Sequence, residues 1–142
     1  MHVLLLTDVP PCTEYTAGLV QKQLCKFLFE ENISVSCISI SDSSLSFNVP
    51  DKIKSQLQYY ECFEKPLEGY GCRYLGEIQS FVFNGFHRQY TIPNLAKTIA
   101  RKISDFSKPI DLIWSVIQGQ TMIEIVPVIA CNLKRPYVTQ IW

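Results

Sequence analysis

The segment at residues 8–18, DVPPCTEYTAG, combines residue types that suit a ligand loop. It follows a short apolar run and leads into a predicted helix. The first backbone N–H groups of a helix and its positive end form a site for phosphate or carboxylate. Gly18 lets an anion approach the backbone closely. We therefore consider Ala17 and Gly18 as an anion-binding helix start, and as an equal alternative that Gly18 serves only packing in the first helical turn.

The same loop matches neither of the two best-known phosphate motifs. The three glycines of the dinucleotide fingerprint G-x-G-x-x-G are missing, and no Gly-Lys-Ser/Thr of a P-loop follows. The loop alone therefore does not define a nucleotide-binding class.

Other polar residues are weaker candidates for chemistry. Asp8, at the end of the first predicted strand, can act as a base, although a loop-fixing carboxylate is the favoured role. His87 stands beside Arg88 and is expected on the surface. The tyrosines can line a carbohydrate groove, with packing as the favoured reading: Tyr59, Tyr60 and Tyr70. No Ser-His-Asp or Cys-His constellation is evident.

Six cysteines are scattered along the chain without a C-x-x-C pair, and there are only two histidines. This spacing gives no support to a zinc site. Because Cys25, Cys37 and Cys131 lie in apolar segments, buried thiols are favoured over disulfides. Buried thiols indicate a reducing compartment, so we expect a cytoplasmic protein.

Chain length and charge further limit which class of protein this sequence can encode. A chain of 142 residues with 47% hydrophobic residues is expected to form one globular domain over residues 1–142. Thirteen Lys and Arg balance thirteen Asp and Glu, so no basic footprint for nucleic acid is present. No apolar stretch is long enough for a transmembrane segment, and the N-terminus lacks the features of a signal peptide.

The apolar periodicity predicts strands alternating with helices. A strand at 2–7, a helix capped by Thr16 and a strand at 33–40 form a βαβ unit. Near the C-terminus we expect a helix capped by Asn94 and ended by Lys108-Pro109. A strand at 111–117, a helix at 121–133 kinked at Pro127 and a strand at 136–141 follow.

The centre of the chain, residues 45–92, has no clean periodicity. Residues 56–63 suggest a strand, residues 76–90 a helix, and residues 68–72 a loop. The pattern as a whole predicts an α/β class, a three-layer Rossmann-like domain with a mainly parallel sheet and helices on both faces. In such sheets ligands bind outside the carboxyl ends of the strands.

The layout resembles the N-terminal lobe of glycosyltransferases with the GT-B fold, particularly retaining enzymes of glycosyltransferase family 4. Residues 3–40 match its strand, Pro-containing loop and helix, residues 109–114 its Pro-Asp strand, and residues 134–139 its Pro-Val-Thr strand. Two positions depart from the family pattern. Ala17-Gly18 replaces the common pair of glycines, and the sequence through Gln118 has no histidine after the Pro-Asp strand.

The resemblance implies a hexosyltransferase of carbohydrate biosynthesis that moves a sugar from a nucleotide-sugar donor. Ala17 and Gly18 are then the donor diphosphate site, and Asp8, Ser115 and Gln118 are acceptor or sugar contacts. The acceptor is a sugar, a lipid-linked molecule or another compound, and the location is cytoplasmic with peripheral membrane contact as an option. The resemblance calls for no metal and no cofactor besides the donor.

The chain ends on a predicted strand without a closing helix, so we expect a second, C-terminal lobe beyond it and no sugar transfer by this lobe alone. The alternative is a stand-alone flavodoxin-like or receiver-like module that binds a small ligand. A receiver needs clustered acidic residues at the end of the first strand, where Asp8 stands alone.

Overall fold

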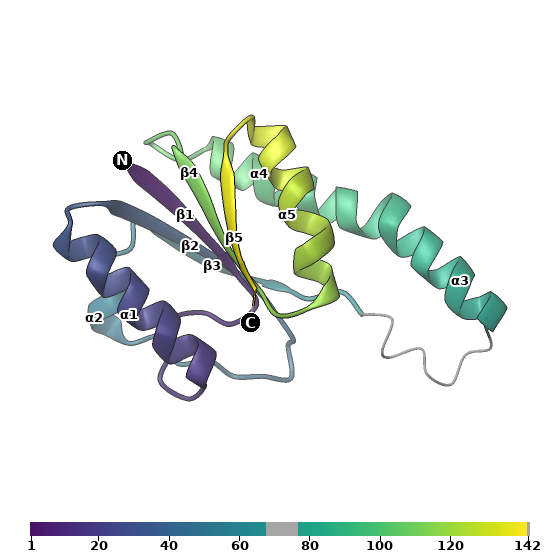
Figure 1. The fold of residues 1–142 in the computed structure, drawn as a ribbon, viewed down its shortest axis with the longest axis horizontal. Helices are drawn as coiled ribbons and strands as arrows, with labels where there is room; N and C mark the ends of the chain where they lie inside the picture. The colour runs from purple at the N-terminus through teal and green to yellow at the C-terminus, as the bar shows by residue number, and fades with distance from the viewer. Residues whose placement is uncertain (68–76, 142) are drawn as a thin grey trace.

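The sheet of the computed structural model, which describes residues 1–67 and 77–141, has five strands in the order β3-β2-β1-β4-β5 (Figure 1). All four pairings of neighbouring strands are parallel. This confirms the predicted α/β class. The strands are β1 (His2–Thr7), β2 (Ser34–Ser41), β3 (Tyr59–Glu64), β4 (Leu112–Ile117) and β5 (Tyr137–Ile141).

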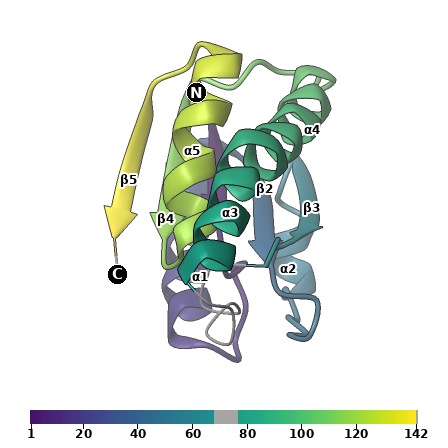
Figure 2. The same ribbon diagram turned by 90° about the vertical axis from the view of Figure 1, so that its right-hand side faces the viewer.

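The helices form a layer on each side of the sheet (Figures 1 and 2). On one side lie α1 (Thr16–Glu30) and α2 (Asp51–Lys54). On the other lie α4 (Ile92–Ser104) and α5 (Gln120–Leu133). A further helix, α3 (Glu77–Phe86), and a π-helical turn, η2 (His87–Thr91), precede α4 and extend away from the sheet. The domain therefore has the three layers expected of a Rossmann-like fold.

The strand order also separates two architectures. Flavodoxin-like and receiver-like domains have the order 2-1-3-4-5, whereas Rossmann-like sheets have 3-2-1-4-5. The order found here is the second. The flavodoxin-like or receiver-like alternative therefore does not describe this sheet.

Strand β1 is the centre of the core. Its side chains alternate between two apolar clusters, one on each face of the sheet. Leu4 and Leu6 face the cluster that α4 and α5 cover, and Val3 and Leu5 face the cluster that α1 and α2 cover. All four are 0% exposed. The uninterrupted apolar run at the N-terminus is thus explained by burial on both faces.

Several helix boundaries differ from the prediction. Tyr15, without a side-chain hydrogen bond, is the N-cap of α1, so Thr16 is its first residue rather than its cap. Residues 77–104 are helical throughout, and Asn94 lies inside this run instead of capping it. The π-helical turn ends one residue before α4 reaches Pro93, which has no N–H to donate to the preceding turn.

Strand β3 and helix α3 occupy the two segments that lack clean periodicity, as the sequence suggested. Helix α4 ends at Ser104, before the expected stop at Lys108-Pro109. Helix α5 continues through Pro127, and the kink expected there stays a prediction. The predicted loop at 68–72 lies outside the described residues. Within the described chain, no helix has both the length and the apolar character needed to cross a bilayer.

Two isoleucines of α5 test the placement of this helix on the sheet. Ile125 is 0% exposed in the core and Ile123 is 58% exposed. We expect Ile125→Ala to lower the free energy of unfolding by about 2–5 kcal/mol because it leaves a cavity. Ile123→Ala should change it by less than about 0.5 kcal/mol. Urea titrations of both variants measure the difference, and similar losses would mean that α5 packs differently.

Candidate functional site

A cavity of about 820 Å³ opens at the carboxyl ends of the strands. It lies beside the point where the strand order reverses, between β1 and β4. The cavity is lined by residues that follow four different strands: Asp8 after β1, Asp42 after β2, Lys65 after β3 and Gln118 after β4. This edge is where Rossmann-like sheets bind their ligands.

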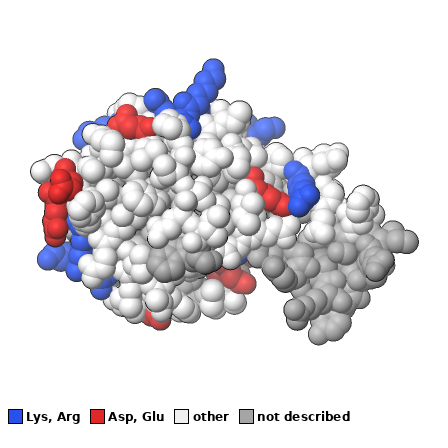
Figure 3. Space-filling model, in the orientation of Figure 1, with Lys and Arg blue, Asp and Glu red and all other residues white. Residues whose placement is uncertain are grey.

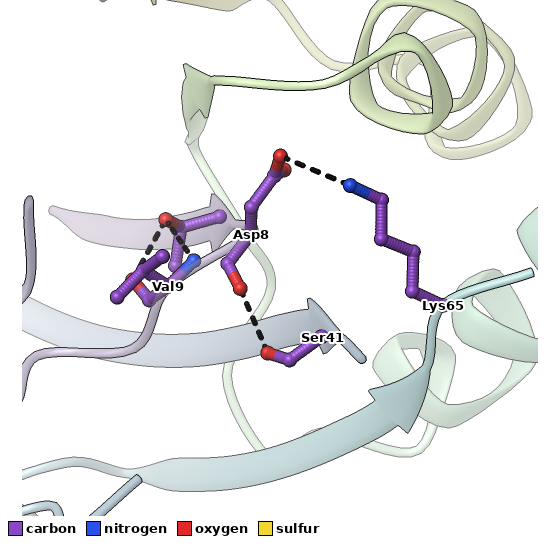
Figure 4. A network of polar contacts seen from close by, with 5 residues as sticks. Asp8, Val9, Ser41 and Lys65 are labelled. Atoms are coloured by element: carbon purple, nitrogen blue, oxygen red, sulfur yellow. Dashed lines mark hydrogen bonds and ion pairs between the residues drawn. The ribbon is translucent and has the colours of Figure 1, made fainter. Parts of the chain in front are cut away.

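Asp8 enters this cavity from a loop whose main chain is firmly held (Figure 4). The Ser41 hydroxyl donates a hydrogen bond of 2.7 Å to the Asp8 carbonyl oxygen, and the Thr7 hydroxyl donates one of 2.9 Å to the Val9 carbonyl. The Asp8 side chain instead points toward the ammonium group of Lys65, at 3.7 Å. Thus the main chain fixes the loop, and the carboxylate forms an ion pair at the cavity wall.

Two further carboxylates and an aromatic ring complete the described wall. Asp42 accepts a hydrogen bond of 2.8 Å from the Ser44 backbone N–H. That bond, together with the Ser44 side chain and the Lys65 charge, lowers the pKa of Asp42 below its usual value. Glu64 accepts a hydrogen bond from the Ser43 hydroxyl at 3.1 Å, and Phe47 adds an apolar surface.

The charge of the wall differs from that of the chain. Among the described lining residues, three carboxylates (Asp8, Asp42 and Glu64) face one ammonium group (Lys65), which leaves a formal charge of −2. The whole sequence has a formal net charge of zero. On the face shown in Figure 3, neither sign gathers into a continuous patch. The described wall is therefore more acidic than the chain as a whole.

The structure brings Asp8 and Gln118 together at the cavity, but not Ser115. Ser115 is 0% exposed, and its hydroxyl lies 3.1 Å from the Val138 carbonyl oxygen and 3.0 Å from the Thr139 hydroxyl. Because these partners belong to β5, the Ser115 side chain joins two strands inside the sheet. A sugar contact by Ser115 stays a prediction, which this arrangement of the hydroxyl does not support.

Ala17 and Gly18 are not among the residues that line the cavity. Gly18 is buried against the loop that precedes α1. A Cβ atom added to Gly18 would lie 2.2 Å from the Cys12 sulfur and 3.1 Å from the Pro10 carbonyl oxygen. Contacts below 3.0 Å do not occur in relaxed structures, so a side chain at this position must displace the Cys12 sulfur, whereas glycine packs without that shift. Its role toward a diphosphate stays a prediction.

A double-mutant cycle tests the packing at Gly18. We expect Gly18→Ala to lower the free energy of unfolding by about 1–3 kcal/mol because the new methyl group meets the Cys12 sulfur. In a Cys12→Ala background the loss should be smaller, since the sulfur is absent. Chemical unfolding of the four proteins measures the coupling. An unchanged or increased stability of Gly18→Ala would show that the space at Gly18 is open.

His87 is a residue that the sequence prediction placed wrongly, because it is buried rather than on the surface. It lies in η2, its ring stacks on Phe83, and its Nε2 is 3.9 Å from Glu124 Oε2. Glu124 also accepts hydrogen bonds from Arg88 Nε at 2.9 Å and from Gln120 Nε2 at 3.0 Å. This cluster joins η2 to the first turns of α5.

The π-helical turn explains why His87 is buried although regular helical spacing would not place it on the buried side. The buried positions of α4 begin at Ile92 and continue at helical spacing through Ala96. Extended backward at the same spacing, they reach residues 88 and 89. The π-helical turn has a spacing of five residues and brings His87 to the buried side instead.

The tyrosine candidates that the structure describes, and Trp114 beside them, are packed against other side chains. The Tyr59 ring packs against Phe106 with centroids 4.6 Å apart, and its hydroxyl donates to Glu61. Tyr60 and Trp114 pack against the cluster under α1. Tyr70 lies outside the described residues.

The five described cysteines are all free thiols. Burial raises the pKa of Cys25 to about 12, and it raises that of Cys37 well above the usual value. Cys62 is exposed, and so is Cys131, contrary to the expectation from its apolar segment. Cys131 lies on the side of α5 that faces away from the sheet. Within the part of the chain that the structure describes, no three His, Cys, Asp or Glu side chains gather so that they could hold a metal ion.

These cysteines give a labelling prediction. At pH 8 the folded chain should react with iodoacetamide at Cys62 and Cys131 before Cys25 and Cys37, because the thiolate is the reactive form and the buried thiols stay neutral. Peptide mass spectrometry after timed quenching assigns each site. Equal rates at Cys25 and Cys62 in the folded protein would contradict the burial described for β2 and α1.

The fold and the edge cavity define a Rossmann-like α/β domain. Two crystal structures of the C-terminal domain of a hydrogenase from Pyrococcus furiosus are similar to it. One, of residues 83–215, has a TM-score of 0.58 at 11% identity and covers 98% of this chain and 90% of that chain. The other, of residues 78–226, has a TM-score of 0.58 at 14% identity, with 98% and 89% covered.

The likeness to these domains concerns the fold, because the identity is too low to carry a function. No protein-family model matches the sequence, and no curated protein matches it. The functional assignment therefore depends on the chemistry of the cavity and on the resemblance in layout.

Proposed function

We propose that this chain is the acceptor-side lobe of a GT-B glycosyltransferase, which moves a hexose from a nucleotide sugar to an acceptor. The observation that carries the proposal is the cavity at the strand-order reversal, which both Asp8 and Gln118 line. Hydroxyl-rich ligands need hydrogen-bonding groups of both kinds. The carboxylates accept, the Lys65 ammonium group donates, and the Gln118 amide does both.

The charge of the cavity supports an acceptor role over a donor role. A nucleotide sugar carries a diphosphate, and an anion of that kind is held by cations or by helix N-termini. The described wall has a surplus of carboxylates. In this proposal the donor is bound chiefly by a second lobe, and its diphosphate meets this lobe at the backbone N–H groups of Ala17 and Gly18.

The contribution of this lobe to the reaction is positioning. Holding an acceptor hydroxyl beside the donor sugar converts an encounter of two molecules into a reaction within one complex. The Asp8 carboxylate, oriented by Lys65, accepts a hydrogen bond from the acceptor, and Gln118 fixes a neighbouring hydroxyl. No resident metal or cofactor belongs to this proposal.

The proposal makes a kinetic prediction for the gene product in which a second lobe follows this chain. We expect Gln118→Ala to raise KM for the acceptor about tenfold and to leave KM for the nucleotide sugar unchanged, because Gln118 contacts only the acceptor. The purified 142-residue chain should transfer no sugar. Donor and acceptor titrations in a nucleotide-release assay measure both constants.

Two results would contradict the proposal. Sugar transfer by the isolated chain would show that one lobe is sufficient. A Gln118→Ala enzyme with an increased KM for the donor and a normal KM for the acceptor would place the donor in this cavity. Asn48→Ala, an exposed substitution outside the cavity, is the control and should leave both constants unchanged.

A further inference from the structure

The carboxylates of the cavity occupy two different positions. Asp8 is 7% exposed, and its carboxylate lies 3.7 Å from the Lys65 ammonium group, so these two described residues bring one charge of each sign to the inner part of the wall. Asp42 and Glu64 are exposed and stand at the mouth. Within the described wall, the surplus negative charge is therefore placed where a ligand enters.

The two outer carboxylates are held in place by their own hydrogen bonds. Ser44 donates to Asp42 at 2.8 Å, and Ser43 donates to Glu64 at 3.1 Å. The donors are successive residues of the loop after β2, whereas Glu64 is the last residue of β3. The loop after β2 therefore holds both carboxylates through its serines. Asp42 and Glu64 lie at the ends of the neighbouring strands β2 and β3, so their negative charges act on the same side of the cavity.

The other part of the described wall is apolar. Phe47 and Leu45 line the cavity, and the Phe47 ring packs against Tyr15 with centroids 5.3 Å apart. The aliphatic face of a sugar ring packs well against such a surface. A phosphate or carboxylate group finds no surplus of cations in the described wall to replace its water, and it is repelled at the mouth.

We propose that Asp42 and Glu64 make this cavity selective by charge, so that it takes an uncharged or amine-bearing sugar acceptor and excludes phosphorylated and carboxylated ones. This inference rests on the proposed function, because it assumes that the cavity holds the acceptor. It adds a substrate class and assigns the selection to two residues that the sequence did not single out.

Three hexoses that differ in charge test the inference: glucose, glucosamine and glucose 6-phosphate. Each is titrated into the full 142-residue chain, labelled with nitrogen-15, and the backbone amide shifts are followed. We expect glucose and glucosamine to shift the amides of Asp8 and Gln118. Glucose 6-phosphate should bind about tenfold more weakly than glucose at low salt, and the difference should shrink as salt is added.

Substitutions then assign the effect to the two carboxylates. The double variant Asp42→Asn, Glu64→Gln keeps the size of both side chains and should bring glucose 6-phosphate to within about threefold of glucose. Glu30→Gln removes an exposed carboxylate from the far end of α1 and is the matched control, with selectivity unchanged. Amide spectra of all variants verify the fold.

The outcomes separate this inference from the function on which it rests. Binding of glucose 6-phosphate as tight as that of glucose, with shifts at Asp8 and Gln118, would overturn the charge selection and leave the acceptor site standing. Unchanged selectivity in the double variant would overturn the assignment to Asp42 and Glu64. Shifts by none of the three sugars would overturn the acceptor site itself and the inference with it.

Discussion

Burial of β1 on both faces is the constraint on which the rest of the structure depends. Its apolar side chains fill two clusters, and its two edges pair with β2 and β4. Because the chain adds strands first on one side of β1 and then on the other, right-handed crossovers place α1 and α5 on opposite faces. The loops that leave β1 and β4 therefore diverge, and the space between them is part of the cavity that Asp8 and Gln118 line.

The alternation of strands and helices could be predicted because burial leaves a periodic signal. The doubly buried β1 and the amphipathic α1 are examples, and they determine the Rossmann-like class. Features that depend on a single local event were not predictable. The π-helical turn brings His87 to the buried side, and the unbroken helical run over residues 77–104 places Asn94 inside a helix. The contacts of the Ser115 hydroxyl were not predictable either, because they depend on where β5 lies in the sheet.

The residues of the cavity likewise include some that the sequence could place and some that it could not. Asp8 and Gln118 could be placed at this edge of the sheet from the sequence because they follow strands with a clear apolar pattern. Lys65 and Glu64 follow or end β3, whose segment has no clean periodicity, so nothing in the sequence placed them beside Asp8. Likewise, a net charge of zero over the chain conceals a local charge of −2 in the described wall. The charge of a site therefore depends on which residues the fold brings together and cannot be read from the composition of the chain.

The proposed function places the acceptor, and not the donor, in the carboxyl-edge cavity. Crystals of the chain can be soaked in turn with a neutral disaccharide and with a nucleotide sugar. We expect disaccharide density between Asp8 and Gln118, with the Asp8–Lys65 pair intact, and no nucleotide density in that space. A nucleotide diphosphate seated against Asp8 and Lys65 would overturn the proposed function, as would a disaccharide bound only elsewhere on the domain.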